Sequence, residues 1–303
     1  MKRIFQTIVV MLVVVFSASA QQESQYSQYM YNTMTFNPGY TGSREVLSAM
    51  ALYRTQWVGL EGSPKTMNFS IQSPVGIHSS LGLNVQNDQI GPTKNTGVTA
   101  NYSYTILGST DLKYSFGISG TLDNFSVDYS KLNVEYPDPY LTGIESQISP
   151  NVGVGFYVHS YSWYVGLSVP KLLKTNYFDD TKETTYSSSS HFYLMAGYVF
   201  DVNPYLKFKP ATMIKAVSGA PIAIDVSANF LINDKLTVGA AYRWDAAVSG
   251  LAGFQVTDGL NVGYAYDYDT THIGNYNSGS HEIFLRFELI SKSKSKMITP
   301  RFF

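Results

Sequence analysis

Residues 260–267 read Leu-Asn-Val-Gly-Tyr-Ala-Tyr-Asp, and this stretch decides the fold class. Large apolar side chains occupy every second position, and small or polar residues stand between them. Successive side chains of a β-strand point to opposite faces, so the segment predicts a strand with one apolar face. The same alternation recurs in about fourteen segments, which is typical of a transmembrane β-barrel.

The N-terminus carries the features of an export signal. Lys2 and Arg3 precede an apolar run over residues 4–16, and Ala18-Ser19-Ala20 supplies small residues at the expected cleavage point. The apolar run is shorter than the ~20 residues that a membrane-spanning helix needs. We therefore expect residues 1–20 to be a cleaved signal peptide. The chain has no cysteine, which excludes a lipoprotein and a disulfide framework.

Composition also favours a membrane barrel over a soluble protein. Charged residues make up 14% of the chain, and the chain contains 24 Tyr and 17 Phe. A soluble domain usually carries about 25% charged residues, whereas the lipid-facing side of a barrel needs none. The formal net charge of −1 gives no sign of a nucleic-acid partner. A secreted β-sandwich is the remaining alternative for the fold.

The alternating segments predict an all-β, antiparallel up-and-down barrel over residues 46–289. We expect about 14 strands, within a range of roughly 12 to 16, because segment boundaries are uncertain by a few residues. An even number of strands would place both termini on the periplasmic side of the outer membrane. The fourteen predicted strands are 46–57, 65–73, 79–86, 96–106, 112–122, 150–158, 162–169, 191–200, 206–216, 221–231, 235–243, 246–255, 260–267 and 280–289.

Charged residues within these segments follow the polar phase of the alternation. A charge that faces lipid at the middle of the membrane costs ~2–4 kcal/mol, whereas a charge that faces the lumen need not. Lys65, at the end of a segment, is the one charged residue on the apolar phase. The twelve on the polar phase are Arg54, Lys113, Lys207, Lys209, Lys215, Asp225, Lys235, Arg243, Asp267, Glu282, Arg286 and Glu288. We therefore predict that these twelve side chains face the lumen.

The connections between the predicted strands alternate between long and short. With periplasmic termini, the outer connections have 2 to 27 residues and the inner ones 3 to 5. Long outer loops and short periplasmic turns are the usual asymmetry of outer-membrane barrels. The pattern thus supports the same orientation.

No motif for catalysis, cofactor binding or metal binding stands out. The five histidines are scattered, and no Gly-x-Ser-x-Gly sequence frames a nucleophile. Asp267 and Asp269 suggest a calcium site, but the alternation places Asp267 in the lumen and Asp269 in a loop. We expect no enzymatic activity, no cofactor and no metal.

The predicted lumen carries eight basic and four acidic side chains, a net charge of +4. Two interpretations remain open: a sealed interior held by paired charges, and a basic pore or peptide groove. The candidate lumen charge network comprises Arg54, Lys215, Arg243, Asp267, Glu282 and Arg286.

The two ends of the mature chain do not alternate. Residues 21–45 are rich in aromatics and turn formers, which predicts a periplasmic or lumen-packing segment at the barrel mouth or against a partner. Residues 290–303 include Ser-Lys-Ser-Lys-Ser-Lys at 291–296 and form a basic tail. This tail is interpreted as a solvated periplasmic extension, with contact to an acidic partner or lipid phosphates as the alternative.

A series of motifs runs in order along the mature chain, and its first three members are the most specific. The stretches are residues 26–32 with 37–42, 53–59, 62–66, 87–93, 166–170, Pro210 with Lys215, 242–243, 263–267 and 279–282. Together they resemble the PorP/SprF family of the type IX secretion and gliding machinery of Bacteroidetes. We therefore expect a multi-pass protein of the outer membrane of a Gram-negative bacterium, in contact with outer-membrane lipid.

The resemblance implies a non-enzymatic protein that supports secretion or cell-surface anchoring of large cargo proteins, such as gliding adhesins. The implied partners are the C-terminal targeting domain of the cargo and periplasmic components of the secretion system. Candidate cargo-contact residues of the outer loops are Trp57, Gly59, Pro64, Asn87, Asp88, Gly91 and Pro92. Such residue types also shape turns regardless of function. The alternative function is a porin-like solute channel with a basic lumen.

Overall fold

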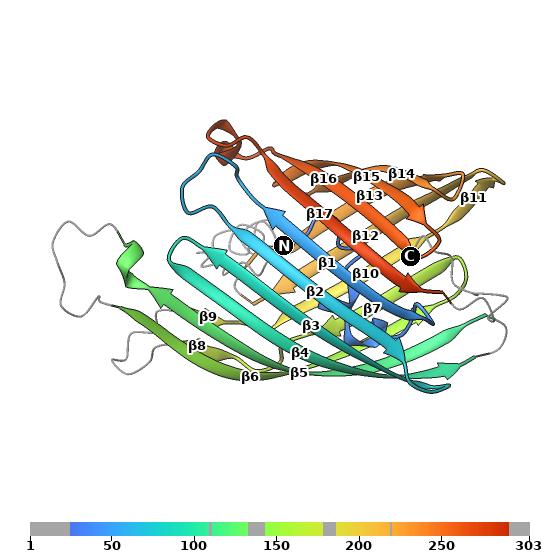
Figure 1. Ribbon diagram of the computed structural model, residues 1–303, viewed down its shortest axis with the longest axis horizontal. Coiled ribbons are helices and arrows are strands. Elements are labelled where there is room, and N and C mark those ends of the chain that lie inside the picture. The colour runs from blue at the N-terminus through green and yellow to red at the C-terminus, as the bar shows by residue number, and fades with distance from the viewer. Residues whose placement is uncertain (1–24, 109–110, 133–142, 178–185, 219, 291–303) are drawn as a thin grey trace, which may run out of the picture.

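Fourteen antiparallel strands form a closed barrel in the computed structural model (Figure 1). The structure describes residues 25–108, 111–132, 143–177, 186–218 and 220–290, so the predicted signal peptide and most of the basic tail lie outside the described residues. Each strand pairs with its neighbours in the chain, and pairing of β1 with β17 closes the barrel. The barrel strands are β1 (Leu47–Thr55), β2 (Lys65–Pro74), β3 (Ser79–Ile90), β4 (Thr93–Leu107), β5 (Lys113–Asp128), β6 (Ile144–His159), β7 (Trp163–Val169), β10 (His191–Tyr198), β12 (Leu206–Val217), β13 (Ala223–Ile232), β14 (Leu236–Arg243), β15 (Ala247–Thr257), β16 (Leu260–Asp269) and β17 (Ser280–Leu289).

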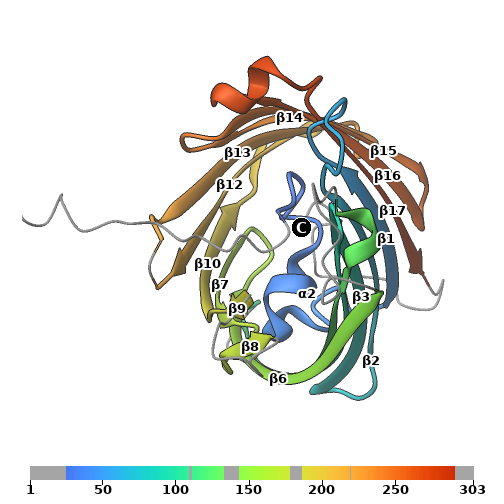
Figure 2. The same cartoon turned by 90° about the vertical axis from the view of Figure 1, so that its left-hand side faces the viewer.

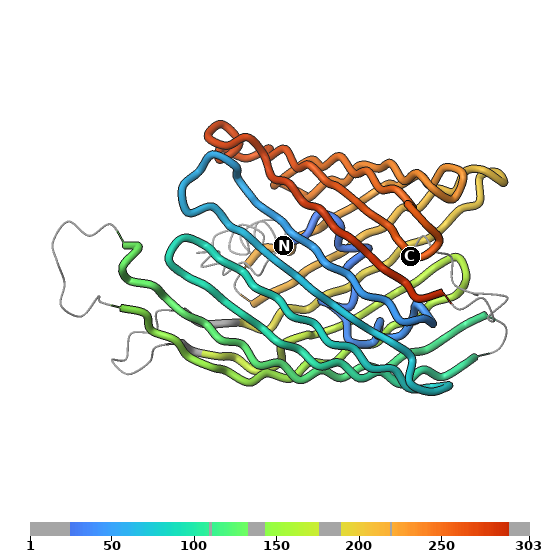
Figure 3. The backbone as a smooth tube through the Cα atoms, viewed as in Figure 1, coloured from blue at the N-terminus to red at the C-terminus, as the bar shows by residue number. Residues whose placement is uncertain are grey.

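The structure confirms the predicted barrel, and every predicted strand overlaps one strand of the barrel wall, which Figure 3 traces as a continuous tube. Three further short strands were not predicted. β11 (Phe200–Asn203) pairs with β12 across a register shift, and β8 (Thr175–Tyr177) pairs with β9 (Tyr186–Ser188) as a separate hairpin. Within the described residues, no helix is long and apolar enough to cross a bilayer.

Alternation of side chains produces the two faces of the wall. In β17, Glu282, Phe284 and Arg286 are buried, while Ile283 and Leu285 between them are exposed. The exposed outer face is dominated by aliphatic and aromatic side chains, which lipid accommodates and water does not. The inner face holds most of the charges that the polar phase placed there, such as Arg54, Asp267 and Glu282.

The two ends of the barrel differ in their connections. At one end, here called the short-turn end, β1 begins and β17 ends, with Leu47 paired to Leu289. The opposite end, here called the long-connection end, carries residues 56–64, residues 270–279 and the described residues 170–177 and 186–190 between barrel strands. Figure 2 looks into the barrel from this long-connection end.

The wall extends farther at the long-connection end than the sequence predicted. Residues 123–149 were expected to be a loop, but β5 continues to Asp128 and β6 begins at Ile144. The green ends of these strands project from the barrel in Figure 1. The prediction was wrong because the outward positions Asn124 and Ser126 are polar, so the lipid-facing pattern ends before the strand does.

Residues 25–45, here called the lumen segment, lie inside the barrel. This segment contains the short helix α2 (Thr33–Phe36) and the 3-10 turn η1 (Pro38–Tyr40), and most of its residues are buried. Figure 2 shows it in blue within the ring of strands.

The lumen segment crosses the barrel from end to end. Ser27 bonds to Glu282, which pairs with Arg54 near the end of β1, whereas Arg44 bonds to Glu288 at the opposite end. The segment therefore runs antiparallel to β1. Gln25, the first described residue, lies with Ser27 towards the long-connection end, whereas β1 begins and β17 ends at the short-turn end.

Glycines in the wall make room for this segment. A Cβ atom on Gly117 of β5 would lie 2.2 Å from the backbone nitrogen of Gly39, and one on Gly155 of β6 would lie 2.1 Å from Asn37 Oδ1. The side chain of Asn37 donates to the carbonyl of Phe156 at 3.0 Å. The segment thus packs directly on the backbone of the wall.

Candidate functional site

A buried ionic cluster holds the beginning of the lumen segment. Arg54 Nη2 lies 2.7 Å from Asp267 Oδ2, and Arg54 Nη1 lies 3.3 Å from Glu282 Oε2. The three side chains come from β1, β16 and β17, which are neighbours in the wall. All three are almost fully buried, so each charge depends on the others for compensation.

This cluster binds the backbone of the lumen segment. Glu282 accepts hydrogen bonds from the N–H groups of Ser27 and Gln28, both at 2.9 Å. The Ser27 hydroxyl donates to Asp267 at 2.5 Å and accepts from Arg54 at 2.6 Å. Charged groups on the wall therefore serve as hydrogen-bond partners for a segment that water cannot reach.

Two further arginines hold carbonyl groups of the lumen segment. Arg243 donates to the carbonyl of Tyr26 at 3.3 Å and to Asp225 at 2.8 Å. Arg286 donates to the carbonyl of Tyr31, and its guanidinium carbon lies 5.4 Å from the centre of the Tyr31 ring.

The Tyr31 ring joins a second cation to the segment. Lys209 Nζ, on β12, lies 5.1 Å from the centre of the same ring, within the range of cation–π attraction. The same ring thus lies within reach of both Lys209 and Arg286. The electron-rich face of the Tyr31 ring therefore partly compensates the positive charges of Lys209 and Arg286.

The end of the lumen segment is fixed at the short-turn end. Arg44 Nε donates to Glu288 Oε1 at 2.7 Å, and both side chains are buried. Between this end and the ionic cluster, Ser103 donates to the carbonyl of Thr41 at 2.5 Å, and Ser168 donates to the carbonyl of Phe36 at 2.8 Å. The segment is thus bound along its whole described length.

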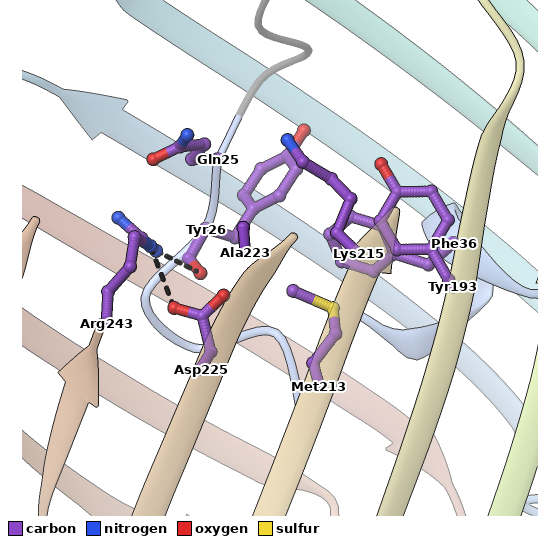
Figure 4. Close-up of a pocket in the computed structure, with 9 residues that line it drawn as sticks. All are labelled: Gln25, Tyr26, Phe36, Tyr193, Met213, Lys215, Ala223, Asp225 and Arg243. Carbon is purple, nitrogen blue, oxygen red and sulfur yellow. Dashed lines mark hydrogen bonds and ion pairs between the residues drawn. The ribbon is translucent and has the colours of Figure 1, made fainter. Parts of the chain in front are cut away.

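Two spaces between the described residues of the segment and the wall are the size of single water molecules. One cavity of about 20 Å³, shown in Figure 4, lies between Tyr26 and the wall residues Lys215, Asp225 and Arg243. Another, of about 10 Å³, lies between Tyr31, Tyr40 and Arg286. A cavity needs roughly 10–15 Å³ to hold one water, so neither space provides a passage for a solute.

The structure brings together part of the predicted lumen network. Arg54, Asp267 and Glu282 form one cluster; Arg243 pairs with Asp225; Arg286 binds the lumen segment; and Lys215 lines the cavity at the mouth. Lys235 departs from its predicted place, because it lies exposed in the turn before β14. Asp269, weighed as a calcium ligand, accepts instead from Trp57 Nε1 at 3.4 Å.

Hydrogen bonds connect the loops at the long-connection end into a rim. Val58 donates to Gly279 at 2.9 Å and accepts from Ser278 at 2.8 Å, which joins residues 56–64 to residues 270–279. Gly91 donates to Gly62 at 2.9 Å, which joins residues 56–64 to the β3–β4 turn. The rim, defined as residues 56–64, 91–92 and 270–279, is therefore a bonded unit.

The rim contains most of the predicted cargo-contact residues. Trp57 is half-buried at a φ of 49°, Gly59 is exposed, and Pro64 is buried beside the start of β2. Gly91 and Pro92 form the β3–β4 turn.

The placement of Asn87 and Asp88 in a loop was wrong. Both lie within β3, where Asn87 donates to Thr96 at 2.6 Å and Asp88 accepts from Thr66 at 2.5 Å. Asn87 lies on the outward phase of β3, so its polar side chain indicates a strand that continues beyond the lipid, whereas Asp88 lies on the inward phase with Thr66.

Sequence reasoning missed the residues of the lumen segment that contact the wall. Ser27 and Gln28 contribute backbone N–H groups, which leave no trace in a residue pattern. Arg44 offers a usable signal, because it is the first charged residue after an uncharged run over residues 25–43. Such a lone charge beside a barrel with buried acids indicates an ion pair.

Residues 18–287 match the sequence profile of the family described as type IX secretion system membrane protein PorP/SprF. The chain belongs to this family. A search of curated proteins finds no match.

Solved structures with a similar fold are outer-membrane barrels. The CymD monoaromatic hydrocarbon channel is 11% identical with a TM-score of 0.53, and the match covers 86% of this chain and 93% of that one. The Ralstonia pickettii toluene transporter TbuX is 8% identical with a TM-score of 0.51, and the match covers 84% of this chain and 92% of that one. At such identities the similarity concerns the fold alone.

Family and fold together establish the compartment. The protein is a multi-pass β-barrel of the outer membrane and a membrane component of type IX secretion. The predicted localisation and family are thereby confirmed.

Proposed function

We propose that this PorP/SprF protein supports secretion or cell-surface anchoring of large cargo proteins by binding their C-terminal targeting domains at the rim. Gliding adhesins are one class of cargo that such a role would serve. The proposed role is non-enzymatic, and periplasmic components of the secretion system are its second partner.

The filled lumen is the observation that carries the proposal. The wall residues Glu282, Arg243, Arg286 and Glu288 bind backbone groups or side chains of the lumen segment, and the two described spaces beside it are water-sized. A barrel closed in this way offers partners its ends and loops rather than a channel. Family membership then favours a protein as the partner over a solute.

The orientation of the barrel follows the general asymmetry of outer-membrane barrels. Long connections usually face the outside and short turns the periplasm. On this basis the rim faces the cell surface, where an exported protein arrives. The short-turn end, with Arg44 and Glu288, faces the periplasmic machinery.

The rim is suited to binding because it is already ordered. Its three segments share backbone hydrogen bonds, and the Trp57 side chain is fixed on Asp269. A preorganised surface loses less conformational entropy on binding than free loops do. The exposed Gly59 at its centre lets a partner approach the backbone closely.

Co-purification from native outer membranes tests the proposal directly. We expect gentle extraction of the tagged barrel to recover a large surface protein that carries a C-terminal targeting domain. A variant with rim residues 58–62 replaced by serine is compared with the wild type. It should no longer co-purify with the surface protein, while the barrel stays folded. Recovery of the barrel alone under the same conditions would contradict the proposal.

A conductance measurement separates this function from that of a solute channel. Basic residues Lys215 and Arg243 at the lumen mouth are the feature that favours a channel. We expect the purified barrel in planar bilayers to show no large, steady current. Sustained open-channel currents from the intact protein would support the channel instead.

A further inference from the structure

Two lysines interrupt the apolar outer face of the wall. Lys65, the charged residue that breaks the alternation in the sequence, begins β2 and is exposed. Lys94 is exposed too, and it belongs to β4, which begins at Thr93 rather than at the predicted residue 96. Among the described residues of the fourteen wall strands, the outward positions hold one other lysine, arginine, aspartate or glutamate, Asp128 at the far end of β5.

The register of the sheet brings the two lysines into one row. Lys65 pairs with Gln89 of β3, and Gln89 pairs with Lys94 on its other side. Figure 1 shows β2, β3 and β4 side by side at the long-connection end. Directly paired residues project from the same face of a sheet, so both side chains extend outward from backbones about 10 Å apart.

Neither lysine is compensated by an acid of the described chain. Within the described ranges, the ammonium groups of Lys65 and Lys94 form no ion pair. Lys113 and Lys207, by contrast, each pair with a carboxylate. The nearby Asp88 lies on the inward phase of β3, between the outward positions. The outer face of β2 and β4 therefore presents two cations to its surroundings.

The row lies at the base of the rim. In the other direction it continues through β1 and β17 to Tyr266 of β16, whose hydroxyl donates to the carbonyl of Ser278 in the rim at 3.2 Å. Tyr264 and Tyr268 share the outward face of β16 with Tyr266. Aromatic side chains gather where a barrel passes from lipid to water, so the row marks the headgroup level.

Apolar side chains lie next to the lysines on the side towards the middle of the membrane. Met67 and Phe69 follow Lys65 at alternate positions of β2 and are 55% and 46% exposed, and Val98 is exposed on β4. Cations above an apolar wall match a lipid, whose phosphate lies above its acyl chains. An acidic protein would match the cations but not the apolar wall.

We propose that Lys65 and Lys94 bind the phosphate group of an outer-leaflet lipid at the base of the rim. Each ammonium group ends a flexible stem, so both can donate to the oxygens of one headgroup. The acyl chains lie against the apolar face of β2 to β4. This contact fixes the depth of the barrel in the membrane and thereby the height of the rim above it. The inference goes beyond the proposed function, because it requires no cargo at the rim.

Lipid binding by lysine variants tests the proposal. The probe is phosphorylated lipid A, added to the detergent-solubilised barrel and measured by native mass spectrometry. Lys65→Gln and Lys94→Gln should each weaken binding about fivefold, and the double variant should combine the two losses. Both positions are exposed, so resistance to urea should stay that of the wild type.

Lys235→Gln is the matched control. Lys235 is exposed in the turn before β14, at the short-turn end, so the substitution removes the same charge far from the row. This variant should bind lipid A as the wild type does. Equal binding by the wild type and the double variant would overturn the proposal, and so would an equal loss in Lys235→Gln.

Three further outcomes concern the identity of the ligand. Dephosphorylated lipid A should bind weakly, and binding as tight as that of the phosphorylated form would overturn phosphate recognition. Displacement of lipid A from the wild type by inorganic phosphate at similar concentration would replace the lipid with a free anion. If the double variant keeps lipid A but loses a protein that co-purifies with the wild type, the lysines bind an acidic protein instead.

Discussion

The lumen and the rim of this barrel are both held by polar contacts, but of opposite kinds. In the lumen, buried charges such as Arg54 and Glu282 bind a segment that water does not reach. At the rim, neutral backbone groups such as those of Val58 and Gly279 bind each other at the surface. Removal of one buried charge leaves another uncompensated, whereas removal of one rim contact admits water.

This difference separates contacts that maintain the fold from contacts at a surface that is available to a partner. Contacts that are costly to break fix the lumen segment, whereas the rim contacts lie at the surface, where single contacts contribute less to stability and the ordered backbone is accessible to a partner. Substitutions in the lumen should therefore act on stability, and substitutions at the rim should act on partner binding. The following predictions, from the largest expected effect to the smallest, test this division.

Deletion of residues 25–42 should convert a closed barrel into a conducting one. The deletion removes the segment that fills the lumen and exposes the charges of the wall to water. Planar-bilayer recordings should change from the absence of large currents to steady, ohmic conductance. A folded deletion variant that still fails to conduct would show that the wall closes the lumen without the segment.

Arg54→Met should destabilise the barrel by about 3–5 kcal/mol, because Asp267 and Glu282 would remain buried without their cation. The free energy of unfolding in urea measures the loss. Lys235→Met is the matched control and should change stability little, since Lys235 is exposed in a turn. Equal effects of the two substitutions would remove the distinction between lumen and surface charges.

Gly42→Ala should destabilise the barrel by about 1–3 kcal/mol. Gly42 has a φ of +81°, and a Cβ atom there would lie 1.9 Å from Ser80 Oγ. Gly76→Ala provides the control, because a Cβ atom on Gly76 meets nothing within 4 Å. Gly42→Ala should unfold at a clearly lower temperature than Gly76→Ala. Equal unfolding temperatures would show that Ser80 can move to accommodate the added methyl group.

Trp57→Phe should have the smallest effect, about 1 kcal/mol or less, since it removes one hydrogen bond to Asp269 at a half-exposed site. Urea unfolding measures it, with Trp244→Phe as the control on an exposed tryptophan. A loss as large as that of Arg54→Met would place the rim among the structural elements.

Much of the fold follows from the alternation of residues alone. Strands such as residues 260–267 were predictable because lipid requires apolar residues on one face along the whole membrane-spanning length. The ends of β3, β5 and β6 were not predictable in this way. Once a strand leaves the lipid, as at Asn87 or Asn124, its outer face becomes polar and the signal disappears.

The site was predictable only on its wall side. Arg54, Asp267 and Glu282 share the inward phase, and register then brings them together. Their partners in the lumen segment are mostly backbone groups, and backbone hydrogen bonds carry no residue code. The path of residues 25–45 through the lumen therefore required the structure.

The attachment of the lumen segment to β17 also sets an order in time. Ser27 is among the earliest of these residues to be synthesised, but its partner Glu282 belongs to the final strand. The contact between Ser27 and Glu282 can therefore form only after the last strand has been made, and Arg54 of β1 completes it. The beginning of the segment is thus held at the seam where the first and last strands of the barrel meet.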